Sequence, residues 1–62
     1  MRRAEIDKTL KNGGRIVNRI LVNGSNQPTG KVSDRQVNKL LSDGAVSEQV
    51  HYDKTRTYRP NT

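Results

Sequence analysis

The residues that could do chemistry in this chain are few, and they form no catalytic set. The single histidine, His51, stands close to Asp53 in the sequence, but a pair in one strand end is poor evidence for acid–base catalysis, which depends on geometry first. Ser33 precedes an amphipathic segment, where a helix cap explains it better than a nucleophile does. Gly13 and Gly14 lack the following Lys-Ser/Thr of a phosphate loop. We therefore expect a binding protein and not an enzyme.

The composition also argues against cofactors and membranes. There is no cysteine, which excludes a disulfide scaffold and a thiolate metal site. One histidine and dispersed carboxylates predict no metal site, and we expect no cofactor. No apolar run approaches the roughly 18 residues of a membrane span, and the basic start lacks the apolar region of a secretory signal. These features predict a cytoplasmic protein without membrane contact.

Binding chemistry is better represented, on one segment and on the region that follows it. The polar side of residues 33–43 carries Arg35, Asn38, Lys39 and Ser42. Arginine and asparagine can read guanine and adenine edges in a major groove, and lysine and serine suit phosphates. The alternative is an ordinary solvated helix face.

A second basic group follows, and the whole chain is basic. The group comprises His51, Lys54, Arg56 and Arg59. Twelve Lys and Arg against six Asp and Glu give a net charge of +6. A charge of this size on a small domain favours a polyanionic partner, usually nucleic acid, although any soluble domain needs some net charge. Arg2 and Arg3 could form a basic arm or a merely solvated terminus.

The segment over 33–43 has helix signals at both ends. Ser33 and Gln36 have the spacing of a capping box. Gly44 stands where a left-handed residue ends a helix, and Ala45 can then complete a Schellman motif. The sequence predicts a helix here with one apolar stripe.

Helical spacing over residues 2–12 predicts a first helix. Residues 15–22 fit either a helix or a strand, and their β-branched residues favour a strand. A flexible loop is expected over 23–30 and a short return strand near 30–32. Residues 46–60 predict a β-hairpin with its turn at 53–56.

These elements amount to one small domain over residues 1–62, with frayed ends at 1–3 and 60–62. Its expected core is small, because apolar residues make up only 29% of the chain. The expected core residues are Ile6, Leu10, Ile16, Ile20, Val22, Val32, Val37, Leu40, Leu41, Val46, Val50 and Tyr58.

The capped helix and hairpin resemble the second half of winged-helix DNA-binding domains. The residues that carry the resemblance are Leu40 or Leu41, Gly44 and Val46, followed by the hairpin to Tyr58. The resemblance covers about half of the chain. It implies an α+β fold, which we expect as a reduced winged helix in the order α-β-β-α-β-β, since only one clear helix precedes residue 33.

The sequence therefore predicts a small basic protein that binds nucleic acid, most simply duplex DNA, as an accessory factor or transcriptional regulator. A homodimer would supply a symmetric DNA site. The first alternative is a protein-interaction module, such as a small phage-like or toxin-like inhibitor that blocks a partner protein. The second is RNA or ribosome binding, which ranks lower because only Tyr52 offers an exposed aromatic ring. The size and charge are typical of small phage, plasmid or prophage proteins.

Overall fold

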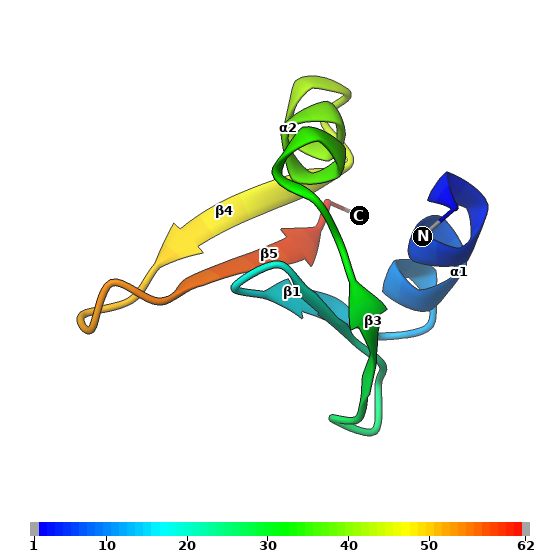
Figure 1. Ribbon diagram of the computed structural model, residues 1–62, viewed down its shortest axis with the longest axis horizontal. Helices are drawn as coiled ribbons and strands as arrows, with labels where there is room; N and C mark the ends of the chain where they lie inside the picture. Colours follow the sequence, from blue (N-terminus) through cyan, green and yellow to red (C-terminus); the bar gives the residue numbers. More distant parts are fainter. Residues whose placement is uncertain (1, 62) are drawn as a thin grey trace.

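The computed structural model describes residues 2–61 and has two helices and a five-stranded antiparallel sheet. The chain is therefore a small α+β domain (Figure 1). In chain order its elements are α1 (Arg3–Lys11), β1 (Arg15–Val17), β2 (Ile20–Val22), β3 (Pro28–Lys31), α2 (Asp34–Ser42), β4 (Val46–Val50) and β5 (Arg56–Pro60).

The strand predicted over 15–22 is in fact two strands joined by a tight turn. Asn18 and Arg19 both have positive φ, 48° and 68°, which is the backbone of the two-residue turn that suits a twisted hairpin. Asn18 is held there because its N–H donates to the carbonyl of Arg56 at 3.0 Å and its Oδ1 accepts from the N–H of Arg56 at 3.2 Å. The observed order is thus α-β-β-β-α-β-β, one strand more than predicted.

The loop predicted over 23–30 is shorter than expected, because β3 begins at Pro28 and includes most of its second half. Asn23 organises the remaining turn, and its Oδ1 accepts from the N–H groups of Ser25 (2.9 Å) and Gln27 (3.0 Å). Such a side chain replaces backbone hydrogen bonds within a turn.

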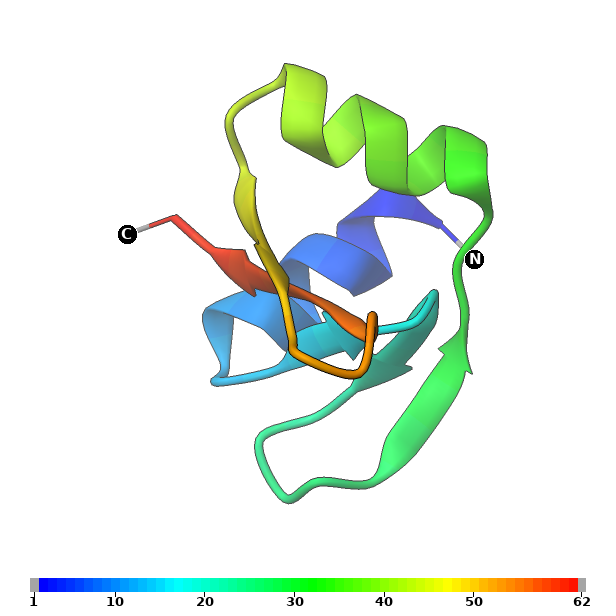
Figure 2. The same ribbon diagram turned by 90° about the vertical axis from the view of Figure 1, so that its left-hand side faces the viewer.

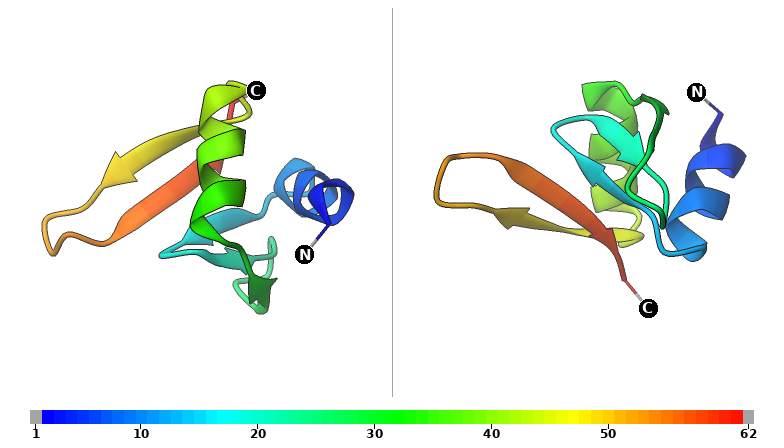
Figure 3. Two further views of the ribbon diagram at one scale, coloured as in Figure 1. Left: turned by 45° about the horizontal axis from the view of Figure 1, so that its top comes forward. Right: turned by 90° about the horizontal axis from the view of Figure 1, so that it is seen from below.

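The strands lie in the order β3-β2-β1-β5-β4, so β1 is central and the last strand in the chain, β5, lies between β1 and β4. Both helices lie on one face of this sheet, with α2 above the strands (Figure 2). The opposite face carries no helix, as the view from below shows (Figure 3). The β4–β5 hairpin projects beyond the helices as a wing (Figure 1).

One cluster of buried side chains joins the two helices to the sheet. Its members are Ile6, Leu10, Ile16, Leu21, Val32, Val37, Leu40, Val46 and Tyr58. Eight of these nine residues were predicted, and the ninth, Leu21, was missed although it is only 1% exposed. Successive strand residues face opposite sides, so Leu21 and its neighbour Ile20 cannot both point into the core between the sheet and the helices.

Four residues predicted to be in the core are not fully buried. Ile20 is 38% exposed and Val50 is 58% exposed, whereas Val22 and Leu41 are partly buried. Ile20 and Val22 lie on the uncovered face of the sheet. Val50 belongs to the part of the wing that extends past the core.

Near both chain ends, some of the residues predicted to fray belong to regular elements or to hydrogen bonds. Arg3 begins α1 and Pro60 ends β5. The backbone N–H of Asn61 donates to the carbonyl of Ala45 at 2.9 Å, and its Nδ2 donates to the carbonyl of Gly44 at 3.0 Å. Residues 1 and 62, also predicted to fray, lie outside the described part.

Candidate nucleic-acid interface

The helix at the centre of the candidate interface, α2, is capped as the sequence predicts. Ser33 Oγ accepts from the N–H of Gln36 at 3.2 Å, and Gln36 Oε1 accepts from the N–H of Ser33 at 3.0 Å. At the other end, the N–H of Ala45 donates to the carbonyl of Leu40 at 2.9 Å, which is the bond that defines a Schellman motif. Both ends of α2 are therefore fixed by local hydrogen bonds.

The outward side of α2 gathers all four residues predicted on it around one shallow hollow. The residues lining that hollow are Arg3, Arg35, Gln36, Asn38, Lys39 and Ser42. We call this surface the α2 face. It is brought together because the apolar stripe of the helix, Val37 and Leu40, is buried against the sheet. The polar side chains then point away from the core.

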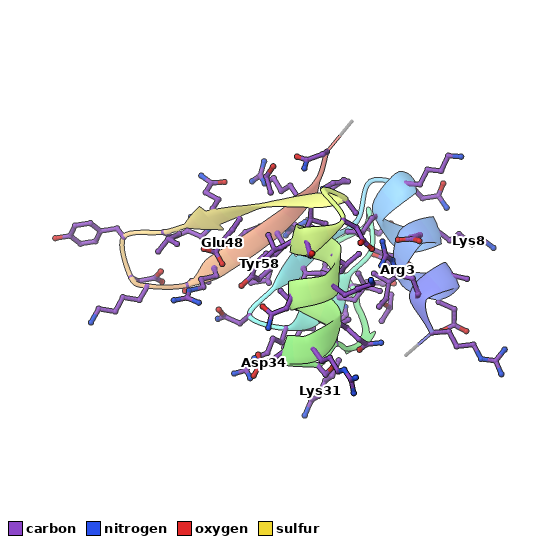
Figure 4. The ribbon with its side chains drawn as sticks, turned by 90° about the horizontal axis from the view of Figure 1, so that it is seen from above. Arg3, Lys8, Lys31, Asp34, Glu48 and Tyr58 are labelled. Atoms are coloured by element: carbon purple, nitrogen blue, oxygen red, sulfur yellow. The ribbon has the colours of Figure 1, made fainter. Side chains whose placement is uncertain are left out.

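Arg3 belongs to this surface, although the sequence suggested only a basic arm or a solvated terminus. Its guanidinium donates to Asp7 of α1 and to Asp43 at the end of α2, both at 2.9 Å. The hydrogen bond from Arg3 lowers the pKa of the Asp43 carboxyl. Lys39 Nζ lies 3.8 Å from the same carboxylate. Arg3 thus lies between α1 and α2 (Figure 4), and Asp43 offsets part of the positive charge at this end.

The wing ends in a turn that begins at His51, two residues earlier than predicted. The N–H of His51 donates to the carbonyl of Thr55 at 2.7 Å, and the N–H of Lys54 donates to the carbonyl of His51 at 2.9 Å. Asp53 Oδ1 accepts from the N–H of Thr55 at 3.0 Å, and this hydrogen bond lowers the pKa of the Asp53 carboxyl. The turn is therefore well hydrogen-bonded even though it contains no glycine.

The ring of His51 has a hydrogen-bond partner within the wing. One ring nitrogen, Nε2, lies 2.6 Å from Oγ1 of the buried Thr57. The carboxylate of Asp53 is engaged with the turn backbone instead. The His51 ring and the Asp53 carboxylate therefore have different hydrogen-bond partners.

Lys54 and Arg56 of the wing line a second hollow that reaches the start of α2. Its other lining residues are Asn18, Arg19, Asp34 and Tyr58. Sequence analysis missed Arg19, whose guanidinium contacts both carboxylate oxygens of Asp34 at 3.0 and 3.1 Å. This ion pair links the β1–β2 turn to α2, and such a contact between separate elements has no local sequence signal.

The same side of the wing contains one acidic residue, Glu48, directly across from Tyr58 in the β4–β5 ladder. The two lie beside one another next to α2 (Figure 4). Burial raises the pKa of the Tyr58 hydroxyl, and Glu48 raises it further. The surface between α2 and the wing is therefore mixed in charge.

Arg59 is not brought together with the other predicted residues. Side chains that face each other across an antiparallel pair share one side of the sheet. Tyr58 pairs with the core residue Ile16, whereas Arg59 is the next residue along β5 and pairs with Ser47. Arg59 therefore points to the face of the sheet that the helices leave uncovered.

No family model, curated protein or solved structure matches this chain. Within residues 2–61, no helix is long and apolar enough to cross a membrane. The same residues contain no group of three or more histidine, aspartate or glutamate side chains placed to hold a metal ion.

Proposed function

We propose that the chain is a small cytoplasmic DNA-binding protein that acts as an accessory factor or transcriptional regulator. The observation that carries this proposal is the α2 face, where Arg35, Asn38, Lys39 and Ser42 share one hollow. None of these four is needed for the core, and the helix is firmly capped. A rigid helix with base-reading and phosphate-binding side chains is the usual means of major-groove recognition.

The wing supports the same proposal. Lys54 and Arg56 line the hollow that adjoins the first turn of α2, so a duplex in contact with the helix would pass near these two cations. Phosphate contacts position a protein on DNA, while base contacts select a sequence. We assign the first role to Lys54 and Arg56 and the second to Arg35 and Asn38.

The arrangement of capped helix, glycine and hairpin also supports the proposed likeness to winged-helix domains. It comprises α2, Gly44 and the β4–β5 wing. Only one helix precedes α2, however, and the strands β1, β2 and β3 lie between the two helices in the chain. The partner helix that usually supports the recognition helix is replaced by α1, tied to α2 through Arg3.

RNA binding is a weaker candidate because of the side chains on the sheet. Sheets that bind single-stranded RNA stack bases on exposed aromatic rings. The uncovered face here presents Val17, Ile20 and Val22 instead, and Tyr52 stands alone at the tip of the wing, fully exposed. The geometry therefore favours duplex DNA.

The proposal is tested by fluorescence anisotropy with a labelled mixed-sequence duplex over a series of salt concentrations. Affinity should fall steeply with salt, with a log–log slope of about −0.9 for each phosphate neutralised. Lys54→Ala or Arg56→Ala should make the slope shallower by about one unit for every sequence tested. Arg35→Ala or Asn38→Ala should relax sequence preference by roughly 1–3 kcal/mol at one base pair.

Lys8→Ala is the matched control, because it removes one positive charge from the exposed side of α1, away from the α2 face and the wing. If Lys8→Ala weakens binding as much as Lys54→Ala does, binding depends on net charge alone. No binding at low salt, or four variants that bind like the unchanged protein, would refute the proposal.

A further inference from the structure

The uncovered face of the sheet has its own chemistry, distinct from the α2 face. Side chains that alternate with the core residues must point to this side. At its centre are Val17 and Ile20, which pair directly across β1 and β2, with Val22 two positions further along. We call these three residues the apolar centre. Ile20 is 38% exposed, and the two valines are partly exposed.

Cations stand on both sides of the apolar centre. Arg15 and Arg59 line one hollow at one end of the β1–β5 pair. Beyond the apolar centre, on β3, Lys31 pairs with Ile20 of β2. Both residues line another shallow hollow. Only Arg15 has a side-chain partner among the hydrogen bonds found, the neutral Asn26 oxygen at 2.8 Å. We call Arg15, Lys31 and Arg59 the basic rim.

The side-chain carboxylates lie outside the apolar centre and the basic rim, so positive and negative charge are separated on this molecule. Glu5 and Asp7 are on α1, and Asp34 and Asp43 lie at the two ends of α2. Glu48 lies on the helix side of the wing, and Asp53 lies in the wing turn. One of them, Asp34, borders the hollow that Ile20 and Lys31 also line. Arg19 neutralises it through two hydrogen bonds.

We infer that the uncovered sheet face is a protein-docking surface that takes an acidic amphipathic helix of a partner. Such a helix presents an apolar stripe with carboxylates beside it. The stripe would cover Val17, Ile20 and Val22, while the carboxylates would meet the basic rim. Burying these aliphatic groups supplies affinity, and the charge pairs select an acidic partner over others.

Two other occupants fit this face less well. A second copy of the chain would bring two basic rims together, which opposes association. A nucleic acid would satisfy the rim, but its bases stack on aromatic rings, and the centre is aliphatic. The docking surface lies on the opposite side of the sheet from the α2 face, so this inference does not depend on the proposed DNA binding.

The test uses the whole chain and a synthetic helical peptide with one leucine stripe flanked by glutamates. Binding is followed by fluorescence anisotropy at low salt, and the contact is located by methyl chemical shifts. We expect saturable binding with shifts concentrated at Val17, Ile20 and Val22. Two control peptides, with glutamines for the glutamates or serines for the leucines, should bind at least about tenfold more weakly, the change expected for 1.4 kcal/mol.

Variants separate this surface from the rest of the molecule. Ile20→Thr keeps a β-branched residue in the strand, and Arg59→Gln removes one rim charge; each should weaken peptide binding by about threefold or more. Val50→Thr is the matched control, because Val50 is a more exposed aliphatic residue of the same sheet on the wing. It should bind the peptide normally. All three variants should bind the DNA duplex as before, apart from a small loss of nonspecific attraction for Arg59→Gln.

If Ile20→Thr proves unfolded by circular dichroism, Arg59→Gln and the two control peptides still decide the question. Failure of the glutamate–leucine peptide to bind, or equal binding of the serine peptide, would overturn the inference. Shifts confined to the α2 face would overturn it as well. None of these results changes the outcome of the salt-dependent DNA test. The docking surface and the proposed DNA binding can therefore be refuted independently.

Discussion

Truncating the two adjacent leucines of α2 tests how the structure divides the helix between core and surface. The apolar stripe suggested that Leu40 and Leu41 would be equally important. In the structure Leu40 is 0% exposed, whereas Leu41 is only partly buried against the cluster. Leu40→Ala and Leu41→Ala remove the same atoms from the same helix turn and change helix propensity equally. Any difference between them therefore reports burial.

The expected magnitudes follow from the buried atoms. Three carbons lost from a closed site cost about 2.4 kcal/mol at about 0.8 kcal/mol each, and the cavity left behind brings Leu40→Ala to about 3 kcal/mol. Leu41→Ala should cost about 1 kcal/mol, because much of its surface is already in water. At roughly 0.05–0.15 kcal/mol per residue, the whole domain has only about 3–9 kcal/mol of stability.

Urea denaturation followed by circular dichroism measures both changes. With a slope near 1 kcal/mol per molar urea for a small domain, the midpoint should fall by about 3 M for Leu40→Ala and about 1 M for Leu41→Ala. If Leu40→Ala is unfolded without urea, Leu40→Met, which conserves volume, should remain folded. Equal losses for the two alanine variants, or a larger loss for Leu41→Ala, would refute the assignment of the buried side of α2.

Three further predictions concern single positions. Ser33→Ala should lower the free energy of unfolding by about 1 kcal/mol, because the N-terminal cap of α2 loses its acceptor, and urea denaturation would show it. Gly14→Ala should lower the free energy of unfolding more than Gly44→Ala in the same assay. A Cβ at Gly14 would lie 2.6 Å from two backbone oxygens, whereas a Cβ at Gly44 would meet no atom within 4 Å. Gly44→Ala should therefore cost only the left-handed backbone conformation of that residue, about 1–2 kcal/mol. In a Tyr52→Phe variant, the remaining Tyr58 should ionise above its ordinary pKa of 10.0, as followed by tyrosinate absorbance; because the folded state holds this proton more tightly, stability is present below that pH and is lost as pH rises through the raised pKa.

Local signals explain which parts of the fold were predictable. The ends of α2 are specified by Ser33, Gln36 and Gly44, which act within one or two helix turns, and their hydrogen bonds are those expected. The β1–β2 turn was missed because Asn18-Arg19 contains no glycine. Its left-handed backbone is stabilised by a strand far along the chain, which sequence spacing does not reveal.

In the candidate site, too, local signals were readable from the sequence and contacts between distant segments were not. The four residues on the α2 face follow from helical periodicity, which is local. Arg3 and Arg19 join it through ion pairs with Asp43 and Asp34 that exist only after the elements have packed together. The face on which Arg59 lies depends on strand alternation, which could have been counted from Tyr58. A basic residue beside a buried aromatic in a strand should be assigned to the opposite side of the sheet.

The interior position of the last strand, β5, has a consequence for how the molecule folds. β5 pairs with β1 on one side and β4 on the other, and Tyr58 joins the core through its pairing with Ile16. The helices and the β1–β2 and β2–β3 hairpins can start to form from neighbouring residues, but they acquire a common core only when β5 closes the longest loop in the chain. Such distant contacts slow folding and make it cooperative. Because β5 pairs with β1 as well as with β4, the attachment of the wing cannot open without separating strands that share the core, whereas the tip of the wing can bend.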